Sequence, residues 1–203
     1  MNNITGFTED TPKNLLLGAG KLYKNLKFSA DGTIDEENSK CFGATSGGNV
    51  FTVTPEFFTP EIDGVYVKMK GNNHKVGETA TLEVNMTELK RDILMSAAVG
   101  ELSAEENAAY DVITSKAEIS DEDYYENIAF VGEKTDSTLI IIVMENALCT
   151  GGLGIDAKHK DTAKPKLTFE CNQHAGGDPR KLPWKIYFPK EHSSAVQPTG
   201  GEV

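Results

Sequence analysis

Residues that could form a catalytic or metal site are few and widely spaced in this chain. No Gly-x-Ser-x-Gly motif is present. Cys171 and His174 have the C-x-x-H spacing of zinc ligands, but Cys171 lies on the apolar face of an alternating segment, which favours a buried thiol. We therefore expect no cofactor, no metal site and no enzymatic activity. All the histidines lie in polar, loop-like contexts: His74, His159, His174 and His192.

Glycine-rich and acidic segments do not complete a known binding motif. Residues 18–20 and 150–154 have neither the Gly-Lys-Ser/Thr of a P-loop nor a dinucleotide-binding fingerprint. The acids of residues 31–37 miss the spacing of an EF-hand calcium loop. These segments are predicted to be turns and solvated loops.

The charge balance is strongly acidic. The 203 residues include 31 acidic and 20 basic side chains, a net charge of −11. Residues 101–136 hold 11 of the acids against only Lys116 and Lys134. Such a surface repels nucleic acid phosphates at long range. It is either a solvated surface that maintains solubility or a surface that faces something negative without holding it.

Signals for export and membrane insertion are not found. The first residues have no basic region followed by an apolar stretch, as a signal peptide would. The longest apolar run, residues 139–144, is far shorter than a membrane span. The three cysteines are an odd number at wide spacing. We expect an intracellular protein with free thiols and no membrane insertion.

Alternation of apolar and polar residues predicts a mainly β protein, an antiparallel β-sandwich or barrel-like subunit. Residues 139–144 are apolar without alternation, which predicts a strand covered on both faces. Residues 125–131 should pair with this strand as a hairpin. The alternating segments are residues 51–54, 65–69, 81–86, 166–171 and 184–188.

One flanking α-helix is predicted at residues 87–98, with Thr87 as its N-cap and Gly100 just after its end. Residues 29–49 have no periodicity and are predicted to be a long loop with a binding or assembly role. We expect a single β domain at residues 14–189, between a flexible N-terminal arm at 1–13 and a flexible tail at 190–203.

Several segments, taken in order, are similar to one protein family. The sequence resembles the tail tube (major tail) proteins of phages with long, non-contractile tails that infect Gram-positive hosts. No single motif is specific, and the ordered set over about residues 14–189 carries the resemblance. These segments are Asn14–Gly20, Gly43–Asn49, Pro60–Gly64, Tyr110–Ser115, Tyr124–Ala129, Glu145–Leu148 and Pro183–Tyr187.

This resemblance implies a structural virion protein. Six β-sandwich subunits would form a ring, and stacked rings would form the tube through which phage DNA passes during ejection without specific binding. Long loops and terminal arms would join the rings. Its other implied partners are the tape measure, distal tail and tail terminator proteins. Its implied location is the virion tail, assembled in the host cytoplasm.

Six residues are candidates for subunit contacts. Phe57 and Phe58 are adjacent on one strand and should point to opposite faces, so one of them should meet a neighbour. Ile140 and Ile142 lie on the non-alternating strand, which would suit an element buried by a ring partner. Asp63 and Gly64 lie in one of the segments that carry the resemblance. The full set is Phe57, Phe58, Asp63, Gly64, Ile140 and Ile142.

Two other functions stay open. One is the tube protein of a contractile injection machine or a type VI secretion system, which would share this architecture. The other is a ligand-binding β-sandwich, which would need an exposed aromatic platform. Tyr124, Tyr125 and Trp184 are the local candidates for such a platform.

Overall fold

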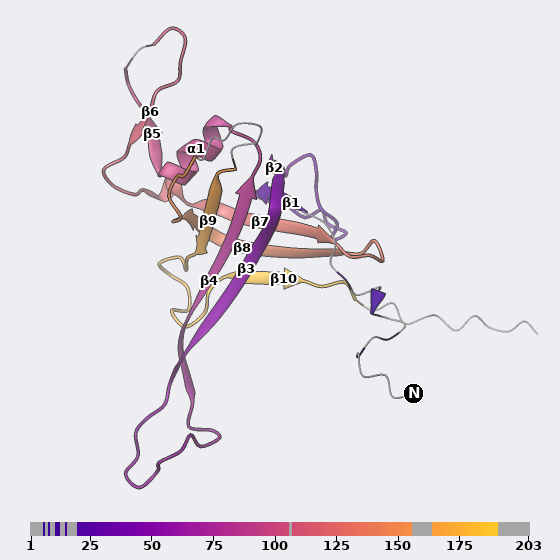
Figure 1. The fold of residues 1–203 in the computed structure, drawn as a ribbon, viewed down its shortest axis with the longest axis vertical. Coiled ribbons are helices and arrows are strands. Elements are labelled where there is room, and N and C mark those ends of the chain that lie inside the picture. Colours follow the sequence, from indigo (N-terminus) through magenta and orange to yellow (C-terminus); the bar gives the residue numbers. More distant parts are fainter. Residues whose placement is uncertain are drawn as a thin grey trace, which may run out of the picture.

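Antiparallel β-strands make up most of the regular structure (Figure 1). The computed structural model describes residues 20–105, 107–155 and 164–190, together with Gly6, Thr8, Thr11, Pro12 and Leu15. Helical elements are α1 (Arg91–Ala98) and the short 3-10 helix η2 (Asp121–Asp123). The strands are β1 (Lys21–Lys24), β2 (Lys40–Gly43), β3 (Thr45–Phe58), β4 (His74–Met86), β5 (Gly100–Leu102), β6 (Ile113–Ser115), β7 (Tyr125–Glu133), β8 (Leu139–Cys149), β9 (Lys166–Cys171) and β10 (Trp184–Tyr187).

The main sheet has the order β2-β1-β7-β8-β9-β4-β3, and β10 also pairs with β8. One edge of β8 changes partner, pairing with β10 at residues 141–144 and with β9 at residues 147–149. Asn146, with φ of 49°, lies at this change, and asparagine tolerates the left-handed region better than most residues. The sheet therefore folds into two layers whose strands cross (Figure 1). The predicted antiparallel β-sandwich with one flanking helix is confirmed.

The main core lies between the two layers and under α1. Alternate residues of β4 and β9 face it, including Leu82 and Phe169, as the period-two pattern predicts. Ile93 and Ala97 of α1 close one end of this core. The helix therefore contributes to the same apolar cluster as both layers.

A second apolar cluster covers the other face of β1, β7 and β8. Ile141 and Val143 face this cluster, where Leu26, Phe28 and Ile34 pack over the strands. Met144, on the same strand, faces the main core. The prediction that residues 139–144 are covered on both faces is therefore confirmed for residues 141–144, where the chain supplies both covers itself, whereas Leu139 is 44% exposed.

Helix α1 begins at Arg91, four residues after the predicted start. The backbone N–H and the hydroxyl of Thr87 both donate to Ala44 O, at 3.0 and 3.1 Å, so this threonine extends the contact between β3 and β4 instead of capping a helix. The predicted end at Ala98 is correct. Gly100 follows in β5, where a Cβ would lie 2.9 Å from Thr114 O.

Two predicted segments were wrong in part. The predicted loop at 29–49 contains β2 and the first residues of β3. Residues 65–69 form no strand and lie in a loop between β3 and β4. The predicted arms at 1–13 and 190–203 fall almost entirely outside the described residues.

Candidate assembly surfaces

The β3–β4 hairpin extends well beyond the sandwich (Figure 1). Its strands pair from Thr45 and Met86 to Phe58 and His74. The next strand, β9, contacts β4 only at residues 81–85. The outer part, residues 54–58 with 74–78, is therefore a two-stranded ribbon, and no third strand of the described residues lies beside it. We call the loop at its end, residues 59–73, the hairpin tip.

Apolar side chains are exposed along this ribbon and tip. Phe57 and Phe58 are 63% and 56% exposed, and Tyr66 is 95% exposed. Both phenylalanines point away from the core because neither face of the ribbon is covered by a second layer. Burying one such side chain stabilises a contact by about 1.5–3 kcal/mol. The other exposed apolar residues here are Ile62, Val65, Val67, Met69 and Val76.

The hairpin tip has a defined backbone. Val65 N–H donates to Ile62 O at 3.0 Å, which closes a turn with Asp63 and Gly64 at its centre. Gly64 has φ of 82°, as the third position of a type II turn requires. A second turn joins Met69 to residue 72. The tip therefore presents its apolar side chains on a structured loop.

Side-chain hydrogen bonds close the neck of the tip. The hydroxyl of Thr59 donates to Asn73 Oδ1 at 2.6 Å, and the Asn72 amide donates to Pro60 O at 3.1 Å. These bonds join the two limbs of the loop where the ribbon ends.

Four of the six predicted assembly residues lie together on this hairpin, and two do not. Ile142 is half-buried and packs against the main core, and Ile140 is half-buried on the same strand. The apolar character of Ile142 is explained by its contact with the main core. The part of both residues in assembly remains a prediction.

Glu78 anchors the base of the ribbon to the loop before β10. Its side chain is only 6% exposed, and its Oε1 accepts a hydrogen bond from Leu182 N–H at 3.0 Å. Lys75 forms an ion pair with its other oxygen. The hydrogen bond from Lys75, followed by that from Leu182, lowers the pKa of the Glu78 carboxyl. The ionised carboxylate therefore holds β4 and the β9–β10 loop together.

Replacing Glu78 by Gln should destabilise the subunit at neutral pH by roughly 1–3 kcal/mol, because a charged hydrogen-bond network is lost. Folding lowers this pKa, so the stabilisation is present above the ordinary carboxyl pKa and disappears as the pH falls through the lowered value. Denaturant titration at pH 7 and near pH 3 measures the free energy of unfolding of both proteins. The difference in this free energy between wild type and Glu78→Gln should be smaller at the lower pH. A difference in unfolding free energy that is the same at both pH values would contradict this prediction. Glu61→Gln, at the exposed tip, is the control.

Strand β3 forms one edge of the sheet. Among the described residues, residues 50–58 pair only with β4 on one side. Glu56 is the sole charged residue in the fourteen residues of this strand. Long edge strands with few charges are sites where another chain can add a strand.

The outward face of β3, β4 and β9 is polar. Residues that alternate with the core positions form it, and we call it the threonine face. Its one basic residue, Lys166, is paired with Glu83 at 2.6 Å. The face consists of Thr52, Thr54, Thr79, Thr81, Glu83, Asn85, Lys166, Thr168 and Glu170, together with Val50, which is 54% exposed opposite Glu83.

The acidic segment is located elsewhere. Its first part forms a second projection, β5, β6 and their connecting loop, which we call the acidic arm (residues 100–115). It lies at the opposite end of the molecule from the hairpin tip (Figure 1). The acids of this arm are therefore not part of the threonine face.

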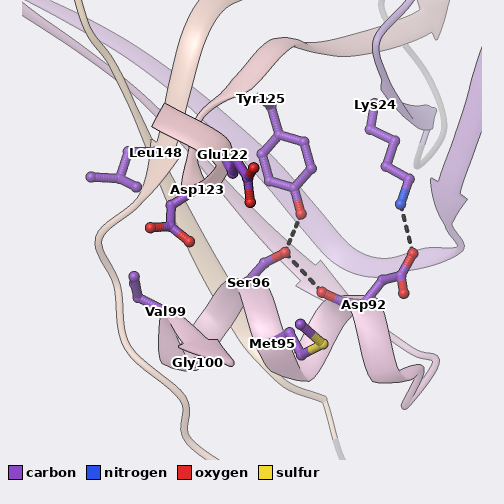
Figure 2. A pocket seen from close by; sticks show the side chains of 10 residues that line it. All are labelled: Lys24, Asp92, Met95, Ser96, Val99, Gly100, Glu122, Asp123, Tyr125 and Leu148. Carbon is purple, nitrogen blue, oxygen red and sulfur yellow. Dashed lines mark hydrogen bonds and ion pairs between the residues drawn. The ribbon is translucent and has the colours of Figure 1, made fainter. Parts of the chain in front are cut away.

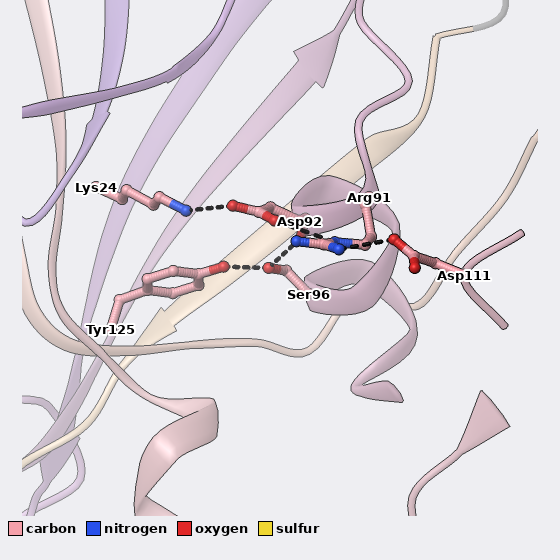
Figure 3. A network of polar contacts seen from close by, with 6 residues as sticks. All are labelled: Lys24, Arg91, Asp92, Ser96, Asp111 and Tyr125. Atoms are coloured by element: carbon pink, nitrogen blue, oxygen red, sulfur yellow. Dashed lines mark hydrogen bonds and ion pairs between the residues drawn. The ribbon is translucent and has the colours of Figure 1, made fainter. Parts of the chain in front are cut away.

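A polar network fixes α1 and the acidic arm to the body (Figure 3). Lys24 Nζ donates to Asp92 Oδ2 at 2.7 Å, and Arg91 Nη1 donates to Asp111 Oδ2 at 2.7 Å. The Ser96 hydroxyl donates to Asp92 O at 2.8 Å and also hydrogen-bonds the Tyr125 hydroxyl. These contacts join the helix to β1, to β7 and to the arm.

The pocket beside α1, of about 160 Å³, is lined by the same network (Figure 2). Burial raises the pKa of Tyr125, so its hydroxyl stays protonated at neutral pH. The hydrogen bond from Lys24 lowers the pKa of Asp92, so this carboxylate stays ionised and paired. Neither histidine nor cysteine lies among the lining residues. The arrangement resembles a structural clamp more than a nucleophile with its base.

Cys171 faces the main core, as the sequence predicts. It is 3% exposed, and burial raises the pKa of its thiol to about 12. Its Sγ donates to Glu145 O at 3.4 Å. Within the described residues, no group of three His, Cys, Asp or Glu side chains has the arrangement of a metal site.

No protein-family model matches the sequence, and no curated protein is significantly similar to it. In the part of the chain that the structure describes, no helix has the length and hydropathy needed to span a bilayer.

Proposed function

We propose that the protein is a structural subunit that assembles with copies of itself into stacked rings, the tail tube of a phage with a long non-contractile tail. One observation carries the proposal: the β3–β4 hairpin projects from the sandwich and exposes Phe57, Phe58 and an apolar tip. Among the described residues, none covers this surface, and large exposed apolar patches typically mark contacts with another molecule. The sequence resemblance supplies the kind of assembly.

The edge of β3 supports lateral contacts in a ring. Hydrogen bonding of this edge to an edge strand of the next copy would continue the sheet from subunit to subunit. Six copies, the number that the resemblance implies, would close a ring in which the unpaired backbone groups of β3 find partners.

The threonine face supports the role of channel wall. Lys166 is held by Glu83, so this face offers DNA phosphates no unpaired cation. Each phosphate neutralised by Lys or Arg strengthens DNA binding, and a wall without unpaired cations would let the genome slide. DNA would then pass without being bound specifically.

On this proposal the assembled protein would lie in the virion tail, after assembly in the host cytoplasm. Its other partners would be the tape measure, distal tail and tail terminator proteins.

Negative-stain electron microscopy of the purified protein tests the proposal. Rings or tubes of uniform diameter are expected at high protein concentration or when tail assembly partners are added. Only monomers under both conditions would contradict it.

The alternative of a contractile or type VI tube protein shares this geometry, and a neighbouring sheath gene would favour it. A ligand-binding sandwich has less support, because its aromatic platform is incomplete. Trp184 packs against Phe51 with ring centroids 6.2 Å apart, and Tyr125 packs against Phe42 and Phe169.

A further inference from the structure

An open hollow lies where β8 changes partner, and we call it the β8 hollow. Its volume is about 450 Å³, within the range of sites for small ligands. It shares no lining residue with the pocket beside α1. Its walls come from three separate segments: η2 with the residue after it, the bend of β8, and the loop that follows β9. The polar and aromatic lining residues are Asp121, Tyr124, Asn146, Asn172, Gln173 and His174.

The lining of the β8 hollow is polar and carries little charge. Asp121 is the one carboxylate among the described residues that line it, and none of these residues is a lysine or an arginine. An anionic ligand would therefore lack the cationic partners that usually bind it. The apolar lining is limited to the ring of Tyr124 and the methyl group of Ala175, whereas sites for apolar ligands are lined mainly by apolar side chains. The β8 hollow thus favours a neutral ligand that is rich in hydroxyl groups.

Several lining side chains keep hydrogen-bonding atoms that no described residue uses. The Asp121 carboxylate and the Asn146 side-chain amide have no hydrogen-bond partner among the described residues. His174 Nδ1 accepts a hydrogen bond from Gly176 N–H at 3.1 Å. The neutral imidazole therefore carries its proton on Nε2, which remains a free donor. Sugar hydroxyls both donate and accept, so they match this mixture of donors and acceptors.

Tyr124 adds an aromatic surface to the β8 hollow. Among the three aromatic residues expected in a ligand platform, Trp184 and Tyr125 pack against other rings. Tyr124 is half-buried and packs against no ring of the described residues. The C–H face of a pyranose can pack on such a ring while its hydroxyls reach polar neighbours. Ring and polar groups line one hollow, so one ligand can contact both.

The loop after β9 holds its share of the β8 hollow in place. Gln173 Nε2 donates to Lys181 O at 2.8 Å and so crosses the loop. A Cβ at Gly177 would lie 2.3 Å from the Gln173 side chain, so this crossing requires glycine. Asn172 Nδ2 donates to Glu170 O at 2.9 Å, which fixes the Asn172 amide beside the strand.

The wall formed by η2 is fixed as well. Ser120 N–H donates to Asp123 Oδ2 at 2.7 Å, and Lys116 Nζ donates to the same oxygen at 2.6 Å. Tyr124 N–H donates to Asp121 O at 3.3 Å, which sets the positions of these two lining residues relative to each other. Groups that are held in place before a ligand arrives lose less conformational entropy on binding.

We infer that the β8 hollow binds a neutral saccharide. The Tyr124 ring packs against the C–H face of one pyranose, and Asp121, Asn146 and His174 hydrogen-bond its hydroxyls. This is an activity separate from assembly, and a single subunit suffices for it. Because the site has one aromatic ring and water competes for its exposed polar groups, its affinity should be weak, with a Kd on the order of 1 mM.

Saturation-transfer difference NMR of the purified protein tests the inference. The probes are the methyl glycosides of glucose, galactose, mannose and N-acetylglucosamine at millimolar concentration. At least one glycoside should receive saturation, most strongly at the ring protons of the face that contacts Tyr124. Methylammonium is the contrasting probe, because a carboxylate beside an aromatic ring can also hold a cation. Binding of methylammonium without any glycoside, or no binding of any probe, would overturn the inference.

Three variants assign the binding to the β8 hollow. Tyr124→Ala removes the aromatic surface and Asp121→Ala removes the carboxylate. Asn146→Gly removes the amide, and glycine keeps the backbone φ of 49° without strain. Each variant should weaken the affinity for the bound glycoside by roughly tenfold, the effect of losing one good hydrogen bond or ring contact. The matched controls, Tyr110→Ala and Glu101→Ala, replace exposed residues of the acidic arm and should bind like wild type.

Thermal unfolding shows that each variant is folded before its binding is compared. Asp121→Ala should keep the wild-type midpoint, because the side chain is exposed and has no described partner. Unchanged affinity in all three variants, or an equal loss in the two controls, would overturn the inference. The measurement needs no assembly, so a protein that forms no rings contradicts the proposed function and leaves this result standing.

Discussion

Subunits in which Phe57 and Phe58 are both replaced by serine should fold normally and fail to assemble into tubes. Both side chains are more than half exposed on a ribbon that no second layer covers, so the subunit has little packing to lose. Surface substitutions of this kind usually change stability by less than about 0.5 kcal/mol. Aromatic side chains buried at the centre of an interface often contribute 2 kcal/mol or more each. Losing two would raise the concentration needed for assembly roughly a thousandfold.

Two measurements check this result together. Thermal unfolding should give the wild-type midpoint, and sedimentation should show subunits without tubes at concentrations where wild type assembles. The matched control is Leu89→Ser/Ile155→Ser, because these residues are 52% and 51% exposed and lie outside the hairpin. The control should assemble normally. Tubes formed by the double phenylalanine variant at the wild-type concentration would show that the ribbon is not an interface.

The strands of the sandwich were predictable because their pattern is local. In β4 and β9 every second residue faces the core, so alternation alone identifies both strands and their buried faces. Residues 65–69 alternate in the same way but pair with no strand, since two turns bend the tip there. Alternation depends only on the order of apolar and polar side chains. It does not show whether a partner strand lies beside the segment.

The errors at β2 and at the start of α1 arose from contacts between segments that are separated in the sequence. β2 is only four residues long and is held by pairing with β1, a contact that its own sequence does not encode. The helix start was placed too early because Thr87 has a suitable side chain for an N-cap but is bonded to Ala44 O. These two errors concern segments whose partners lie elsewhere in the sequence, β1 for β2 and Ala44 for Thr87.

The candidate site was predictable in its residues but not in its shape. Adjacent phenylalanines cannot both face one core, so the sequence alone marks Phe57 and Phe58 as unusual. That they lie on a projecting ribbon follows from the shortness of β9, which leaves the outer half of β4 without a second neighbour. Ile140 and Ile142 carry a similar apolar signal, but Ile142 already packs against the main core of its own subunit.

The core offers the largest expected effect on stability, at Phe169. This side chain is fully buried on β9, and its ring lies 6.0 Å from those of Phe42 and Tyr125. The latter two are 5.8 Å apart, so three rings from three strands form one cluster between the layers. Their edge-to-face arrangement adds to the energy of burial.

Phe169→Ala should lower the free energy of unfolding by about 3–5 kcal/mol, because it removes buried surface and leaves a cavity that the layers cannot fill. That is a large fraction of the roughly 5–15 kcal/mol that stabilises a typical domain. Denaturant titration measures the loss, and Phe169→Leu should cost less because its cavity is smaller. A change below about 1 kcal/mol would mean that the layers collapse around the cavity. At low temperature the folded fraction of Phe169→Ala should still assemble, since its hairpin is intact, whereas the Phe57 and Phe58 double variant should be stable and unassembled.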